Sequence, residues 1–184
     1  MTITEEECWE ILSRNTYADD TNIKSRILSM DKDNTIENID AINEVVLWKL
    51  NRSIHISEET ISMLNSIGYL NKPSDVLNDK TVYKLIEDLL SSKGIKLAVA
   101  STILHFYYPN IFPIIDQRSY RELTSNEYPI YSSKDKDKKY IELYLDYINR
   151  CWQFNTENCP GIPFERIDNI LYQRDKEKGN KVKY

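Results

Sequence analysis

Two short segments of the chain contain residue types that could bind phosphate and perform acid–base chemistry. Residues 92–96 read Ser-Lys-Gly-Ile-Lys, a glycine turn with a lysine on each side. A glycine turn between two helices lets the backbone approach a phosphate closely, and the next helix presents unpaired amide groups to it. We therefore expect phosphate contacts at Lys93, Gly94 and Lys96. The second segment ends in Asp116, whose carboxylate could stabilise positive charge or activate a water molecule.

The residues before Asp116 predict where its carboxylate lies. Pro113 fixes its own backbone angle and holds Phe112 in extended geometry. Asp116 is then expected at the start of a helix over residues 117–123, where the helix N-terminus keeps a carboxylate ionised. An aspartate there is also an ordinary N-cap, and Gly94 is also explained as the residue that ends the preceding helix. Both local explanations stay open at this point.

The order of these features resembles the signature of the helix-hairpin-helix/Gly-Pro-Asp (HhH-GPD) DNA glycosylase superfamily, of which the chain looks like a divergent bacterial member. The distance from Gly94 to Asp116 is similar, without a gap, to that between the first hairpin glycine and the catalytic aspartate of adenine-specific mismatch glycosylases. The resemblance covers about 30 of the 184 residues. Similar residue types also fall at Ala100, Ile103, Leu104, Phe112, Pro113 and Ile114.

The resemblance implies a compact, helical glycosylase fold with Asp116 as the catalytic carboxylate. It also implies DNA contacts at the hairpin and at Arg118 and Arg121, which follow the aspartate. The usual hairpin has a second glycine where this chain has Lys96. The side chain of Lys96 or of Lys93 could contact phosphate as a point charge instead. Bifunctional relatives carry a catalytic lysine where this chain has Ala98. A monofunctional enzyme is therefore implied.

We expect no cofactor and no metal. Some relatives in the superfamily hold an iron–sulfur cluster, which needs four cysteine ligands. This chain has three cysteines, at positions 8, 151 and 159, and they form no CxxC motif. Reduced cytosolic thiols are the simplest interpretation of this number and spacing.

Helical periodicity recurs along the chain and strand alternation is nearly absent, which predicts an all-α fold of eight or nine helices. We expect one domain over residues 1–184, with the hairpin and the aspartate segment at 79–124 and a frayed polar tail from about 176 to 184. Residues 97–107 are apolar on most faces and predict a central, buried helix. The other predicted helices span about 4–14, 35–52, 58–68, 80–90, 117–123, 141–152 and 164–171.

An indole beside two cations forms a second candidate group at Trp48, Lys49 and Arg52. Such a group could stack a base on the indole while a cation meets a phosphate. Alternatively, these residues have only a structural role, with the tryptophan in the core and the two cations in solvent. Lys49 is also a candidate nucleophile.

Further candidate site residues lie close to Asp116 in the sequence or in the last predicted helix. Tyr120 could stack on an extruded base. Arg166 and Asp168 begin the last predicted helix, and they could border the pocket or tie this helix to the core through an ion pair. His105 could assist departure of a base, although a packed core histidine is the commoner case in an apolar helix.

Composition restricts the protein class only broadly. The net charge of −5 argues against a broadly cationic DNA-binding protein, but it allows a local basic surface. The N-terminus begins with no cationic segment, and no apolar run approaches the roughly 20 residues that span a bilayer. We therefore expect a cytoplasmic protein with no membrane partner and an undetermined oligomeric state.

Three hypotheses about function follow. The first is a monofunctional DNA glycosylase that removes a damaged or modified base with Asp116 as catalytic carboxylate. The second is a catalytically inactive module of the same fold that holds DNA or a protein partner, and a bacterial defence system is compatible with both. The third is an unrelated helical interaction protein in which Gly94 and Asp116 only cap helices.

Overall fold

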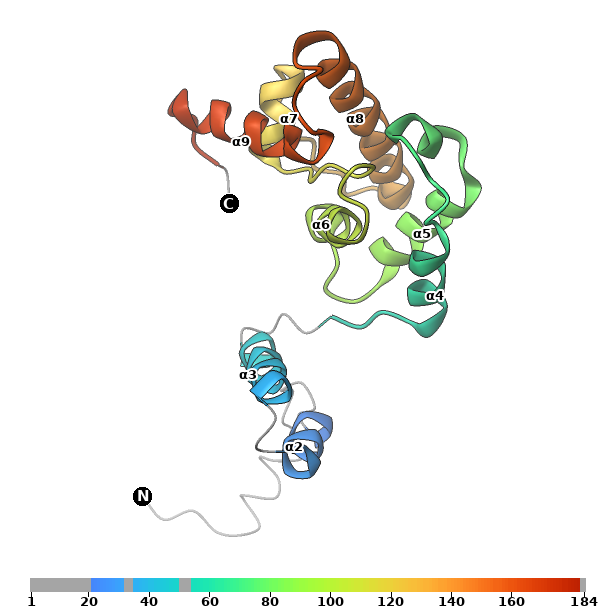
Figure 1. Ribbon diagram of the computed structural model, residues 1–184, viewed down its shortest axis with the longest axis vertical. Coiled ribbons are helices and arrows are strands. Elements are labelled where there is room, and N and C mark those ends of the chain that lie inside the picture. The colour runs from blue at the N-terminus through green and yellow to red at the C-terminus, as the bar shows by residue number, and fades with distance from the viewer. Residues whose placement is uncertain (1–20, 32–34, 50–53, 183–184) are drawn as a thin grey trace. The chain divides into compact units, whose positions relative to one another are not determined.

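The computed structural model describes residues 21–31, 35–49 and 54–182. This part of the chain is all-helical and contains no strand, as the sequence predicted (Figure 1). Its elements are α2 (Thr21–Ser29), α3 (Thr35–Lys49), α4 (Glu58–Ser66), the 3₁₀ helix η1 (Pro73–Asn78), α5 (Lys80–Ser91), α6 (Leu97–Tyr107), α7 (Gln117–Thr124), α8 (Lys136–Asn158), the 3₁₀ helix η2 (Phe164–Arg166) and α9 (Ile167–Glu177).

The chain divides into two compact units, residues 1–53 and 54–184. The described part of the first unit consists of α2 and α3, which an ion pair between Arg26 and Glu44 joins at 2.6 Å. The predicted helix at 4–14 lies outside the described residues. All elements of the hairpin and aspartate segment fall in the second unit.

The core of the second unit forms where α5, α6, α8 and α9 bury one face each. Helix α8, 23 residues long, packs against α5, η1, α7 and α9. Its buried face repeats at helical spacing, as expected for an amphipathic helix. The fully buried apolar side chains of these helices include Leu85, Ile86, Leu89, Leu104, Ile141, Ile148, Ile167 and Leu171.

Helix α6 begins and ends where the sequence predicted, but it is less buried than expected. Ala100, Ser101 and Leu104 are buried on one face. On the other face Phe106 keeps 78% of its surface exposed and Val99 keeps 40%. The prediction of burial on most faces was therefore wrong, because the apolar composition of the helix does not reveal how many faces have a neighbour.

The C-terminal segment also differs from the expected frayed tail. Glu122 on α7 accepts ion pairs from Arg174 at 2.9 Å and from Lys178 at 2.5 Å. Beyond α9, the carbonyls of Asn180 and Lys181 accept hydrogen bonds from arginines of α7. These contacts hold residues 178–182 against α7.

Among the described residues, no helix is long and apolar enough to cross a membrane.

Candidate functional site

The hairpin between α5 and α6 has the backbone geometry that the sequence predicted. Gly94 adopts a φ of 83°, the left-handed region that glycine enters without strain. The Ile95 amide donates to the carbonyl of Ser92 at 3.2 Å, which closes the turn. Lys96 occupies the N-cap position of α6 but makes no side-chain cap hydrogen bond. The first amides of α6 are therefore not used by a cap side chain, and both hairpin lysines are exposed.

Side chains from two other helices hold the carbonyls of the extended segment at residues 112–116. His105 on α6 donates from Nδ1 to the Phe112 carbonyl at 2.8 Å. Two buried tyrosines of α8 follow: Tyr144 donates to the Pro113 carbonyl at 2.9 Å and Tyr147 to the Ile114 carbonyl at 3.1 Å. Burial raises the pKa of both phenols well above the usual range, so they remain hydrogen-bond donors.

The amides of the same segment are held as firmly. The Ile114 amide donates to Oδ2 of Asp168 on α9 at 2.9 Å, and the Ile115 amide donates to the hydroxyl of Ser101 on α6 at 3.2 Å. Asp168 is only 4% exposed, and burial raises its pKa while the Ile114 amide and His105 oppose that change. Three helices thus fix the backbone that leads into Asp116.

Asp116 is the N-cap of α7. Its Oδ1 accepts the amides of Arg118 and Ser119, both at 2.8 Å, and the Ser119 hydroxyl accepts the Asp116 amide at 3.1 Å. This reciprocal pair is a capping box. The cap uses Oδ1 only, so the N-cap explanation leaves Oδ2 available for another role.

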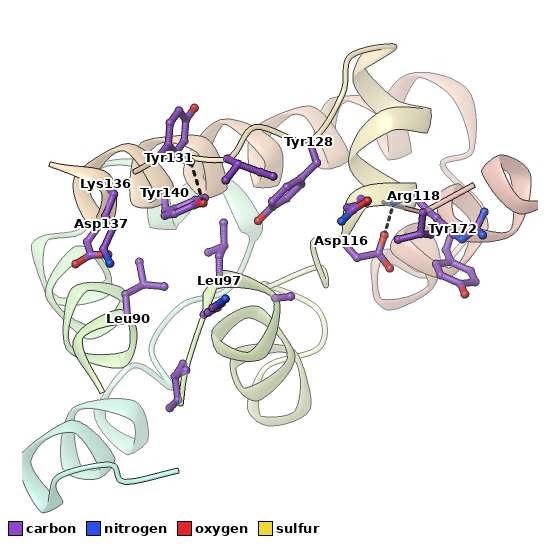
Figure 2. A pocket seen from close by; sticks show the side chains of 16 residues that line it. Leu90, Leu97, Asp116, Arg118, Tyr128, Tyr131, Lys136, Asp137, Tyr140 and Tyr172 are labelled. Carbon is purple, nitrogen blue, oxygen red and sulfur yellow. Dashed lines mark hydrogen bonds between the residues drawn. The ribbon is translucent and has the colours of Figure 1, made fainter. Parts of the chain in front are cut away.

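A cavity of about 620 Å³ brings Asp116 and the hairpin together (Figure 2). Lys96, Leu97 and Ala98, at the start of α6, border it on one side, and Asp116 borders it on another. The volume falls within the roughly 300–1,000 Å³ of typical ligand pockets. Segments 20 residues apart in the sequence therefore meet at one opening.

The remaining wall of the cavity is rich in tyrosine. Tyr128 and Tyr131 come from the loop between α7 and α8, Tyr140 from α8 and Tyr172 from α9. The Tyr131 amide donates to the Tyr140 hydroxyl at 3.1 Å, which ties the loop to α8. Aromatic walls with a few charged groups suit a flat, polar ring such as a nucleobase.

The two predicted DNA-binding arginines lie close to the cavity but are engaged within the protein. Asp175, which is fully buried, accepts Arg118 at 3.1 Å and Arg121 at 2.8 and 2.7 Å. The Arg118 guanidinium also lies 5.6 Å from the Tyr172 ring centre. Arg118 lines the cavity. Contact between either arginine and DNA stays a prediction.

The other predicted site residues are spread over the chain. Tyr120 packs edge-to-face on Tyr128, with ring centres 5.6 Å apart, and so supports the cavity wall. Arg166 is exposed, with its nearest acid, Glu165, at 3.7 Å. Trp48 lies near the end of α3 in the first unit, and the side chain of Lys49 and all of Arg52 lie outside the described part of the structure.

Sequence reasoning missed several residues that define the site. Tyr144 and Tyr147 share the spacing of a buried helix face, so their burial could be predicted, but their carbonyl partners more than 30 residues away could not. Tyr128 and Tyr140 had no distinguishing signal among the 13 tyrosines of the chain. Only the fold shows which of them face the cavity.

No protein-family model matches this chain, and no curated protein or solved structure matches it either. Membership of the HhH-GPD superfamily therefore stays a prediction that rests on the residues of the hairpin and of the aspartate segment.

Proposed function

We propose that this chain is a DNA glycosylase-like protein of the HhH-GPD type that hydrolyses the N-glycosidic bond of a damaged or modified base in DNA. One observation supports this proposal above the others. Asp116 and the uncapped start of α6 border the same cavity, so a carboxylate and a phosphate-binding hairpin face one ligand. A protein that acts on bacterial DNA in repair or defence would work in the cytoplasm.

In this reaction Asp116 is the catalytic carboxylate. The bond between C1′ and the base nitrogen breaks, its electron pair leaves with the base, and positive charge develops on the sugar. A carboxylate stabilises that charge or accepts a proton from the attacking water, whose oxygen bonds to C1′. The water proton ends on the released base. Ala98 stands where a nucleophilic lysine would be needed, which favours a monofunctional enzyme.

The backbone contacts around Asp116 give its carboxylate the fixed position that catalysis needs. Catalytic groups must be held close to one geometry, and supporting hydrogen bonds do this. His105, Tyr144, Tyr147, Ser101 and Asp168 together hold both carbonyls and amides of the preceding residues.

A second candidate is a module of the same fold that binds DNA or a protein partner without cleaving. Lys96 replaces the second hairpin glycine, and the chain carries a net charge of −5. In addition, Asp175 neutralises part of the charge that Arg118 and Arg121 would offer to phosphates. These observations favour DNA contacts that are weaker than those of a hairpin with two glycines and unpaired arginines.

One experiment separates the two candidates. The full chain and its Asp116→Asn variant are incubated with damaged, normal and modified phage DNAs, and free bases are measured by mass spectrometry. We expect the wild type to release a base and the variant to release none. No release on any DNA, together with salt-dependent DNA binding, would select the binding module. Neither release nor binding would reject both.

A further inference from the structure

One phenol projects into the cavity from the loop between α7 and α8. Tyr128 is half-buried, and Figure 2 shows its ring reaching from that loop into the space bordered by Leu97, Tyr140 and Asp116. The Tyr120 ring supports it from behind in an edge-to-face contact. The position of the ring is therefore set by packing rather than by a hydrogen bond of its hydroxyl.

The hydroxyl of Tyr128 differs from those of the three tyrosines of α8 near the site, and in Figure 2 the hydroxyls of Tyr131 and Tyr172 point away from the space that Tyr128 enters. Tyr144 and Tyr147 donate to backbone carbonyls, and Tyr140 accepts the Tyr131 amide. Within the described part of the chain, the Tyr128 hydroxyl has no hydrogen-bond partner, and it is not sealed from solvent. A polar group that is directed into a cavity and has no partner is available to a ligand.

Burial, with a smaller contribution from nearby negative charge, keeps the Tyr128 hydroxyl protonated. Burial raises the pKa of Tyr128 above the usual range, and the negative charge of Asp116 contributes to the same change. The group therefore donates a hydrogen bond at neutral pH. His105 is less suited to this task, because its Nδ1 is committed to the Phe112 carbonyl.

We propose that Tyr128 is a second catalytic residue, whose hydroxyl donates a hydrogen bond to an acceptor atom of the base while Asp116 faces the sugar. This inference rests on the proposed function. The departing base gains electron density as its bond to C1′ breaks, so the hydrogen bond strengthens towards the transition state. The phenol keeps its proton throughout. The base is thus held by its edge at Tyr128 and the sugar at Asp116.

The first test needs no catalysis. Free adenine, guanine, cytosine, thymine and uracil are titrated separately into the 15N-labelled full chain, its Tyr128→Phe variant and the control Tyr107→Phe. Tyr107 is exposed at the end of α6. We expect at least one base to bind the wild type at the cavity, with about three- to tenfold weaker binding to Tyr128→Phe and unchanged binding to the control. No bound base, or equal binding to Tyr128→Phe, would overturn the proposal.

The second test uses DNA from which the wild type releases a base. Tyr128→Phe should lower the single-turnover rate by about ten- to a hundredfold, with DNA affinity changed less than twofold. An unchanged rate would overturn the role of Tyr128 and leave the glycosylase function intact. Conversely, base binding that depends on Tyr128, without release from any DNA, would support the base contact and reject the glycosylase.

Discussion

Asp79 and Asp116 cap two helices of the second unit in the same way, yet their surroundings differ. Oδ1 of each accepts the amides two and three residues further on, at 2.8–3.0 Å. Oδ2 of Asp79 accepts the Tyr69 hydroxyl at 2.6 Å. Asp116 instead lines a cavity with the start of α6. The cap is therefore common to both helices, whereas of the two aspartates only Asp116 lines the cavity.

The N-termini of α5 and α7 also differ in how far along the chain their hydrogen-bonding partners lie. Tyr69 is 10 residues from Asp79 along the chain. Asp168 is 54 residues from Ile114, and Asp175 is 57 residues from Arg118. Helix α9 thus supplies long-range support to the Asp116 region. Changes in α9 should affect Asp116 and spare Asp79.

The largest stability change is expected from Asp175→Ala. This variant leaves Arg118 and Arg121, which are 16% and 15% exposed, without their shared carboxylate. Removing one partner of a buried ion pair costs about 3 kcal/mol, the low end of the usual range, because the guanidinium groups retain some solvent. Urea unfolding measures this cost. A change in the free energy of unfolding below about 0.5 kcal/mol is typical of a surface substitution. Such a result would contradict a stabilising role for the ion pairs of Asp175.

Asp168→Ala should destabilise the protein less, by about 1–3 kcal/mol, because it leaves the Ile114 amide without its acceptor. Faster hydrogen exchange of the Ile114 amide, with unchanged exchange at Thr81 and Val82 beside Asp79, is the specific readout. Asp168→Asn retains an acceptor and should recover most of the protection. Equal acceleration at both helix N-termini would mean global destabilisation instead.

These long-range contacts also mark the limit of sequence prediction. Local rules predicted the helix that Asp79 caps, the N-cap Asp116, the bounds of α6 and the turn at Gly94, because each depends on residues within one turn. They did not predict that Asp168 binds the Ile114 amide. Such pairings depend on how helices pack, and residue types alone do not encode the partner.

A smaller effect is expected at the Asp79 cap. Burial opposes a low pKa of Asp79, but hydrogen bonds from Tyr69, Val82 and Thr81 outweigh it and lower the pKa below the usual 3.8. The carboxylate therefore contributes stability that is present above pH 3.8 and is lost as the pH falls through the lowered value. Tyr69→Phe should reduce this loss, so urea unfolding at about pH 6 and about pH 2 should differ less than in the wild type. An unchanged difference would contradict the role of Tyr69.

The smallest effect is expected at the hairpin. Lys96→Ala removes one exposed cation from the cavity edge. If the hairpin binds phosphate, the slope of log affinity against log salt should decrease by about 1 for duplex DNA. Lys84→Ala serves as a control, because Lys84 is paired with Glu87 and Asp88 on α5. Equal slopes for both variants would place the DNA elsewhere.

The central claim is that the cavity, rather than the cap, gives Asp116 its function. The most direct measurement compares single-turnover base release by Asp116→Asn and Asp79→Asn. Asparagine is an equally good N-cap, so both variants should fold alike. We predict a loss of roughly 10²–10⁴-fold for Asp116→Asn and a rate within about twofold of wild type for Asp79→Asn. Equal rates for the two variants would contradict the account and leave Asp116 as a helix cap.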